Sequence, residues 1–329
     1  MNKRLIHIDI AKGILIFFVI MGHTDFGDNF NIVHKLILWF HMPAFFIISG
    51  LFFENNNYNL IASCGKYLHR YVVPYISWCF LGFLIFPFEP ISKNLIRIIY
   101  AGSINTTEYS YPFWFINTLL LGLLLLTFLT WLHNVILRKE NYFSSFLILF
   151  AFSLFCFGHL MNKKIMDLPW GIGQLTLSFM FIVVGFIYKN KFKYYNMDKY
   201  FWLSSFLSLS FLCILIFING FSFNIKAMMT TNVIVDTIMP CLITYSIFGI
   251  SLILSRFIVI SKLLGYIGKR CMTIFFSHAA VLSILSSNIN IQNPVLNGFV
   301  LFFLTLIISL IICIAIQSNK YTKFFFIGK

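Results

Sequence analysis

Residues 294–317 read PVLNGFVLFFLTLIISLIICIAIQ, a run of 24 residues without a charged side chain. About 20 predominantly apolar residues suffice for an α-helix to cross a bilayer, so this run predicts a transmembrane helix. The rest of the chain has the same character. Of its 329 residues, 60% are hydrophobic and 10% are charged, whereas soluble domains have about 45–50% and about 25%. This composition excludes a soluble globular protein.

Apolar runs of this kind recur along the whole chain, bounded by polar residues or by Gly and Pro. We expect ten such spans, at residues 8–21, 32–53, 71–88, 113–131, 143–157, 170–188, 200–218, 233–254, 272–287 and 294–317. The predicted fold is therefore an all-α integral membrane protein, a bundle of about ten transmembrane helices. We expect residues 1–329 to form a single polytopic membrane domain, without a separate soluble domain.

The basic residues indicate how the spans are oriented. The chain has 24 Lys and Arg residues against 10 Asp and Glu residues, a net charge of +14. With the N-terminus in the cytoplasm, 17 of the basic residues fall in cytoplasmic segments and five in outer ones. Because positive residues accumulate in cytoplasmic loops, this asymmetry predicts that both termini are cytoplasmic. It also accounts for the basic surplus, so no nucleic-acid partner is expected.

The longest outer connection, residues 89–112, contains an amphipathic segment around residues 95–100. Such a segment is typical of a helix that lies in the membrane interface or enters the bilayer without crossing it.

Ionisable side chains inside the spans are costly unless they have a partner or face water, so each is a hypothesis about function. The set comprises Asp9, Lys12, His23, Lys35, His41, Asp236 and His278. On a continuous helix, Lys12 and His23 differ by about 20° in direction and by about 16 Å along the axis. Asp9 lies three residues before Lys12 and can neutralise it. The alternative interpretation is that Asp9 and Lys12 lock this helix into the bundle, with His23 bonded to loop backbone.

The second span ends in FHMPAFFIISG, residues 40–50. Pro43 frees backbone carbonyls near His41, and the small residues at 49 and 50 permit close helix approach, so this segment suits the wall of a cavity. The alternative is a kinked packing helix with one hydrogen-bonded histidine. His278 and Asp236 are open to the same alternative, as partners in structural hydrogen bonds.

Lys66 and Arg70 are four residues apart at the cytoplasmic end of the third span. They share a helix face, which suits a phosphate or diphosphate group. Anchoring of the span by cytoplasmic positive charge explains them equally well.

Two sequence motifs together resemble the membrane-bound acyltransferase-3 family, including its fucose O-acetylase-like branch. The first is DIAKG at 9–13 followed by MGH at 21–23, which is similar to the family's basic residue, ten intervening residues and histidine. The second is HMPAFF at 41–46 with SG at 49–50. Weaker similarities follow at Arg70 with Pro74-Tyr75, at Trp114-Phe115 and at Ser277-His278.

This resemblance implies about ten spans and a membrane O-acyltransferase, most often an O-acetyltransferase. It implies transfer of an acyl group from cytoplasmic acyl-CoA to a sugar hydroxyl of a cell-surface polysaccharide or its lipid-linked precursor. The location it implies is the bacterial cytoplasmic (inner) membrane, as a multi-pass protein of the cell envelope. The partners would be acyl-CoA, the glycan or lipid-linked acceptor and the lipid bilayer, and a homo-oligomer is left open.

The resemblance also suggests roles for individual residues. His23 is similar to the family's essential histidine, Lys12 to its paired basic residue and Arg70 to the basic residue of the third span. Our hypothesis assigns catalysis to His23, Asp9, His41 and His278, and donor binding to Lys12, Lys66 and Arg70. Acetyl-CoA is the expected co-substrate. No metal is expected, because the seven cysteines show no CxxC spacing.

The sequence departs from the family's pattern in three respects. The basic position is Lys12 where many members have Arg, and Lys66 with Arg70 is a loose version of the usual arginine pair. We expect no appended extracytoplasmic hydrolase-like domain, and we therefore expect the membrane part to select the acceptor. Two other functions remain alternatives: a glycan-precursor transporter or flippase, for which a polar path through the membrane is equally expected, and an inactive membrane sensor or scaffold of the same fold.

Overall fold

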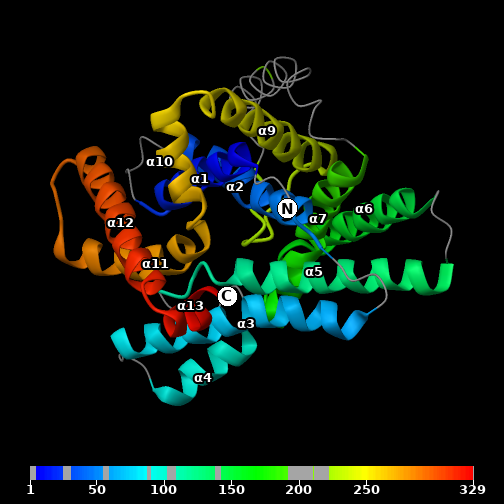
Figure 1. Cartoon of the computed structure of the whole chain (residues 1–329), viewed down its shortest axis with the longest axis horizontal. Helices are drawn as coiled ribbons and strands as arrows, with labels where there is room; N and C mark the ends of the chain where they lie inside the picture. Colours follow the sequence, from blue (N-terminus) through cyan, green and yellow to red (C-terminus); the bar gives the residue numbers. More distant parts are fainter. Residues whose placement is uncertain are drawn as a thin grey trace. The chain divides into compact units, whose positions relative to one another are not determined.

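The computed structural model describes residues 5–24, 31–54, 59–86, 90–101, 109–137, 142–191, 210 and 222–328, and these residues form helices without a single named strand (Figure 1). The one strand-like feature among them is an isolated antiparallel bridge between Asn224 and Met229. The prediction of an all-α protein is therefore confirmed for this part of the chain.

Eight helices of the described chain are long and apolar enough to cross a membrane. They are α2 (Asn31–Leu51), α3 (Leu60–Ile85), α5 (Trp114–Leu132), α6 (Phe143–Met161), α7 (Ile172–Lys191), α9 (Val233–Leu254), α11 (Cys271–Asn288) and α12 (Pro294–Gln317). The predicted number of about ten and the position of the termini stay predictions. The span expected at 200–218 lies outside the described residues, apart from residue 210.

Four helices are shorter than a membrane span: α1 (Ile6–Met21), α4 (Ile91–Tyr100), α10 (Ile258–Gly268) and α13 (Lys320–Ile327). Three further elements are short helical turns: η2 (His133–Leu137), η4 (Asn162–Ile165) and η5 (Pro169–Gly171). The amphipathic segment predicted around 95–100 is helical and belongs to α4, where Leu95, Ile96 and Ile99 are exposed.

Two helix predictions need correction. α3 begins at Leu60, eleven residues before the predicted start, because its first three turns carry polar side chains; the Asn59 side chain caps it by accepting a hydrogen bond from the Ala62 backbone N–H. α10 is a helix, whereas it lies between the spans predicted at 233–254 and 272–287, where no helix is expected. Apolar pattern alone therefore misplaces helices that extend beyond the hydrocarbon or do not cross it.

The chain divides into two compact units, which are described separately. Unit 1 comprises residues 1–45, 194–223 and 234–315, and unit 2 comprises residues 46–193, 224–233 and 316–329. This division follows the density of contacts and leaves the single membrane domain as a prediction.

In unit 1, α1 packs against α10 through closely approaching backbones (Figure 1). A Cβ atom at Gly13 would meet the carbonyl of Leu264, and a Cβ atom at Gly268 would meet the carbonyl of Asp9. Glycine is needed at both positions because any side chain would separate the two helices. The contact fixes the position of Asp9, which is buried.

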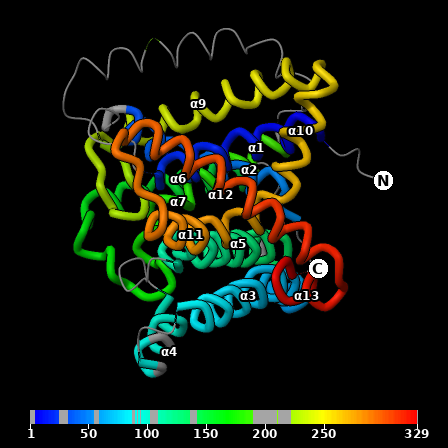
Figure 2. The backbone as a smooth tube through the Cα atoms, turned by 90° about the vertical axis from the view of Figure 1, so that its left-hand side faces the viewer, coloured from blue at the N-terminus to red at the C-terminus, as the bar shows by residue number. Residues whose placement is uncertain are grey.

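In unit 2, α5 lies beside α3 and α7, α6 lies beside α7, and α13 lies against α3 (Figure 2). The α2 residues of this unit approach α7 as closely as α1 approaches α10, with Gly50 against the carbonyl of Ile182 and Gly185 against that of Ile47. Glycine therefore sets the closest helix contact in each unit.

The α1–α10 contact yields a first prediction. Gly268→Ala places a methyl group against the Asp9 carbonyl, so we expect it to lower the stability of the protein by about 1–3 kcal/mol. Gly265→Ala on the same helix is a matched control, because a Cβ atom there meets nothing within 4 Å. Thermal unfolding in detergent measures both variants. Equal melting temperatures would show that the close contact is not required.

Candidate active site

Asp9 and Lys12 form the pair that their spacing predicted. Lys12 Nζ lies 3.9 Å from Asp9 Oδ1, and the Lys12 side chain retains 22% of its exposure against 9% for Asp9. Both residues belong to the part of α1 that packs on α10. The carboxylate partly neutralises a cation inside unit 1, as expected for an i, i+3 pair.

His23 and His278 are brought together although 255 positions separate them in the sequence. Their rings stack with centroids 5.3 Å apart and planes inclined by 16°. The sequence hypothesis treated α1 as continuous to His23, but the helix ends at Met21 and His23 lies in the following turn, with its N–H bonded to the Ile20 carbonyl. This tighter turn changes the predicted direction of His23 relative to Lys12.

The backbone fixes the tautomer of His278. Its ring is fully buried in α11, and Nδ1 lies 2.7 Å from the Phe275 carbonyl and 3.2 Å from the Ile274 carbonyl. A carbonyl only accepts, so Nδ1 carries the proton and Nε2 holds a lone pair. Nε2 is buried and has no hydrogen-bond partner in the described structure. A basic nitrogen is thus available beside His23.

His41 is held in the same way by its own helix. Its Nδ1 lies 2.6 Å from the Ile37 carbonyl of α2, its side chain is buried, and the ring is close enough to His278 for electrostatic interaction. Unit 1 therefore contains all four residues predicted to be catalytic. Of the other ionisable residues singled out inside the spans, Asp236 is buried in α9 and Lys35 is exposed on α2.

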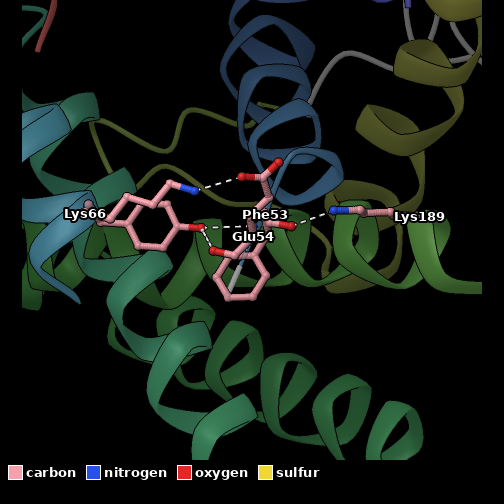
Figure 3. A network of polar contacts seen from close by, with 5 residues as sticks. Phe53, Glu54, Lys66 and Lys189 are labelled. Atoms are coloured by element: carbon pink, nitrogen blue, oxygen red, sulfur yellow. Dashed lines mark hydrogen bonds and ion pairs between the residues drawn. The ribbon is translucent and has the colours of Figure 1, made fainter. Parts of the chain in front are cut away.

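A network of polar contacts in unit 2 includes Lys66, one of the predicted donor-binding residues (Figure 3). We call it the Glu54 network, and its members are Phe53, Glu54, Lys66, Tyr67 and Lys189. Lys66 Nζ lies 2.8 Å from Glu54 Oε2, and Lys189 Nζ donates to the Phe53 carbonyl at 2.7 Å. The Tyr67 hydroxyl accepts from the Glu54 N–H at 3.0 Å and donates to the Glu54 carbonyl at 2.7 Å. Three side chains, two from α3 and one from α7, therefore converge on residues 53 and 54.

The charge of this network is predominantly positive. The hydrogen bond and charge of Lys66, followed by the charges of Lys189 and Arg70, hold the pKa of the Glu54 carboxyl below its usual value. Lys66 was predicted to be available to donor phosphates, but it is engaged with Glu54. The hypothesis omitted Glu54 because a single carboxylate after an apolar run looks like an ordinary loop residue.

Arg70 lies one helical turn after Lys66 on α3, and its backbone is covered by α13. Gly328, at φ +68°, packs so closely on Arg70 that a Cβ atom there would lie 2.7 Å from the Arg70 carbonyl. The Trp78 Nε1–H donates to the Phe326 carbonyl at 3.2 Å, and the Phe324 ring contacts the His69 ring. Arg70 is nevertheless an exposed residue, and its Cζ lies 5.8 Å from the centroid of the Tyr71 ring.

Unit 1 brings the imidazole rings of His23 and His278 together, and His41 belongs to the same unit. Within the described ranges, no group of three or more His, Cys, Asp or Glu side chains is placed to hold a metal ion. Neutral imidazoles with a fixed tautomer are suited to accepting and returning a proton near neutral pH.

Comparison with known proteins identifies the family. A family model described as an acyltransferase domain, acyltransferase-3, matches residues 5–317. The chain belongs to this acyltransferase family. The chain is also 29% identical over 144 residues to nodulation protein NolL of Mesorhizobium japonicum, a match covering 39% of this chain and 37% of that relative. The chain thus spans little more than a third of the relative's length, and no solved structure matches.

The contacts of Tyr67 lead to a prediction about the stability of the protein. Tyr67→Phe removes the hydroxyl that bonds both the N–H and the carbonyl of Glu54. We expect the free energy of unfolding to fall by about 1–3 kcal/mol, measured by thermal unfolding. Glu54→Gln is the control. It weakens only an exposed ion pair and should change stability by less than about 1 kcal/mol. A larger effect of Glu54→Gln would contradict the importance of the backbone contacts.

Proposed function

We propose that this membrane acyltransferase is an O-acyltransferase of the bacterial cytoplasmic membrane. It moves an acyl group, most simply acetyl, from cytoplasmic acyl-CoA to a sugar hydroxyl of a surface polysaccharide or its lipid-linked precursor. Family membership supports acyl transfer in a membrane protein. The observation that carries the chemistry is the stacking of His23 on His278, whose Nε2 lone pair is buried beside it.

In the proposed reaction, His23 takes the proton of the acceptor hydroxyl as that oxygen bonds to the thioester carbon. The carbon–sulfur bond then breaks, and the departing thiolate receives the proton from the imidazolium, so that histidine is regenerated and no net proton is consumed. His278 and His41 orient the base or the acceptor, because each ring is locked by a bond to its own helix. The Asp9 carboxylate partly neutralises the charge of Lys12.

The donor's phosphates are assigned to cations. Arg70 presents an exposed guanidinium, and Lys66 can exchange the Glu54 carboxylate for a phosphate, because the pair between them is exposed and weakly held. Lys12 completes the set in the hypothesis. A transporter or an inactive scaffold would require neither these cations nor a histidine with a free basic nitrogen.

Removal of the base gives the central test. We expect His23→Ala to reduce acyl transfer at least a hundredfold while acetyl-CoA binding persists, because general base catalysis contributes about 10²–10⁴ in rate. Purified protein in lipid nanodiscs, with radiolabelled acetyl-CoA and surface glycan as acceptor, provides the assay. His34→Ala, an exposed histidine on α2, is the control and should remain active. Wild-type rates in His23→Ala would refute its assignment.

Donor truncation tests the phosphate-binding residues. Arg70→Ala should raise the KM for acetyl-CoA about tenfold, the effect of losing one charge-assisted hydrogen bond, and leave the KM for acetylpantetheine, which lacks phosphates, unchanged. Lys93→Ala removes an exposed cation of α4 and should alter neither value. If Arg70→Ala affects both donors equally, Arg70 does not bind phosphate.

A further inference from the structure

Lys226 lies at the tip of a short turn that is firmly anchored in unit 2. The Asn224 and Met229 backbones exchange two hydrogen bonds of 2.8 and 3.0 Å across this turn, residues 224–229, which we call the Lys226 turn. Ile225 and Met228 are buried. The position of Lys226 is therefore set by the backbone and by apolar packing on both sides of it.

Gln174 fixes the turn to α7. Its side chain is fully buried, and its Nε2 donates to the carbonyl of Lys226 and to that of Met166, both at 3.1 Å. One amide group thus connects the Lys226 turn, the turn before η5 and the start of α7. The backbone of Lys226 cannot move outward without breaking a buried hydrogen bond.

The side chain of Lys226 lies over an aromatic ring. Its Nζ is 3.9 Å from the centroid of the Tyr111 ring, just before α5. The residue is half-buried, and burial lowers the pKa of its ammonium group to about 8. Neither ion pair found among the described residues, Lys66–Glu54 and Lys12–Asp9, involves Lys226.

The ammonium group of Lys226 loses hydration on burial, and its contact with the Tyr111 ring replaces only part of it. Lysine is rarely buried unless it is paired, and a cation–π contact offsets only part of the lost hydration. The ring face accounts for one side of the ammonium, which has three N–H donors and no acceptor. An anion would satisfy the remaining donors and restore the cation's balance of charge.

Lys226 is remote from the cations assigned to the donor. Gln174, which holds the Lys226 turn, and Lys189, which holds the Glu54 network, are fifteen residues apart on α7, or about 22 Å. A donor whose phosphates bind Lys66 and Arg70 cannot place the same phosphates at Lys226. An anionic group bound at Lys226 is therefore a different group from the phosphates assigned to Lys66 and Arg70.

We propose that Lys226 and Tyr111 form a subsite for an anionic group of the acceptor, a carboxylate or a phosphate. This inference rests on the proposed function and deepens it, since it names an acidic glycan or a phosphate-linked sugar as the acceptor class. The carboxylate would come from an acidic sugar, and the phosphate from a lipid carrier. Both chemistries need the same cation and the same ring.

Ligand-induced stabilisation tests the subsite independently of catalysis. The full-length protein in nanodiscs is heated with methyl glucuronide, with polyprenyl phosphate in the bilayer, or with neutral methyl glucoside. We expect at least one of the two anions to raise the melting temperature of the wild type and methyl glucoside to have no effect. Which anion acts distinguishes the carboxylate from the phosphate.

Variants of Lys226 assign the effect. Lys226→Met should abolish the shift, Lys226→Arg should retain it, and Lys164→Met, which removes an exposed lysine of η4, should leave it unchanged. If Lys226→Met does not fold, loss of the shift in Lys226→Gln serves instead. No shift with either anion in the wild type, or the same shift in Lys226→Met, would overturn the proposal.

Transfer assays separate this proposal from the proposed function. With an acidic acceptor, Lys226→Met should raise the acceptor KM about tenfold and leave the KM for acetyl-CoA unchanged. Anion binding through Lys226 without any acyl transfer would preserve the subsite and refute the O-acyltransferase. Acyl transfer without anion binding at Lys226 would refute the subsite and preserve the O-acyltransferase.

Discussion

The hydrocarbon core of a membrane contains no water to satisfy polar groups, and this constraint governs the candidate active site. His41 and His278 meet it by donating Nδ1–H to carbonyls of their own helices. Each donation commits one ring nitrogen to structure and leaves the other as a base. The requirement for internal hydrogen bonds and the requirement for a defined tautomer are therefore met by the same contacts, without any additional polar residue.

Much of the fold follows from apolar run length. α9 and α12 have the predicted bounds, because uninterrupted hydrophobic runs of more than 20 residues have one simple solution in a bilayer. α3 and α10 do not, because their ends or their whole length carry charges that hydropathy assigns to loops. Packing against α13 and α1 makes these segments helical, and such partners are distant in sequence.

The candidate site was predictable where the interaction is local. The Asp9–Lys12 pair follows from a spacing of three residues, and His23 and His278 were each identified by the cost of polar groups in a span. Their stacking was not predictable, since it depends on how α1 and α11 cross. Glu54 was missed for a related reason: its importance comes from Lys66, Tyr67 and Lys189, which surround it only in the folded unit.

The docking of α13 on α3 has a consequence for biogenesis. The Trp78 indole and the Phe326 carbonyl that it binds are separated by 248 positions, so a ribosome completes α3 long before α13 exists. Throughout that interval the surface of α3 around Arg70 lacks its cover. Non-local contacts of this kind form late in folding. The surroundings of Arg70 are thus among the last parts of the protein to mature, because they are completed only after the other helices of their unit have been made.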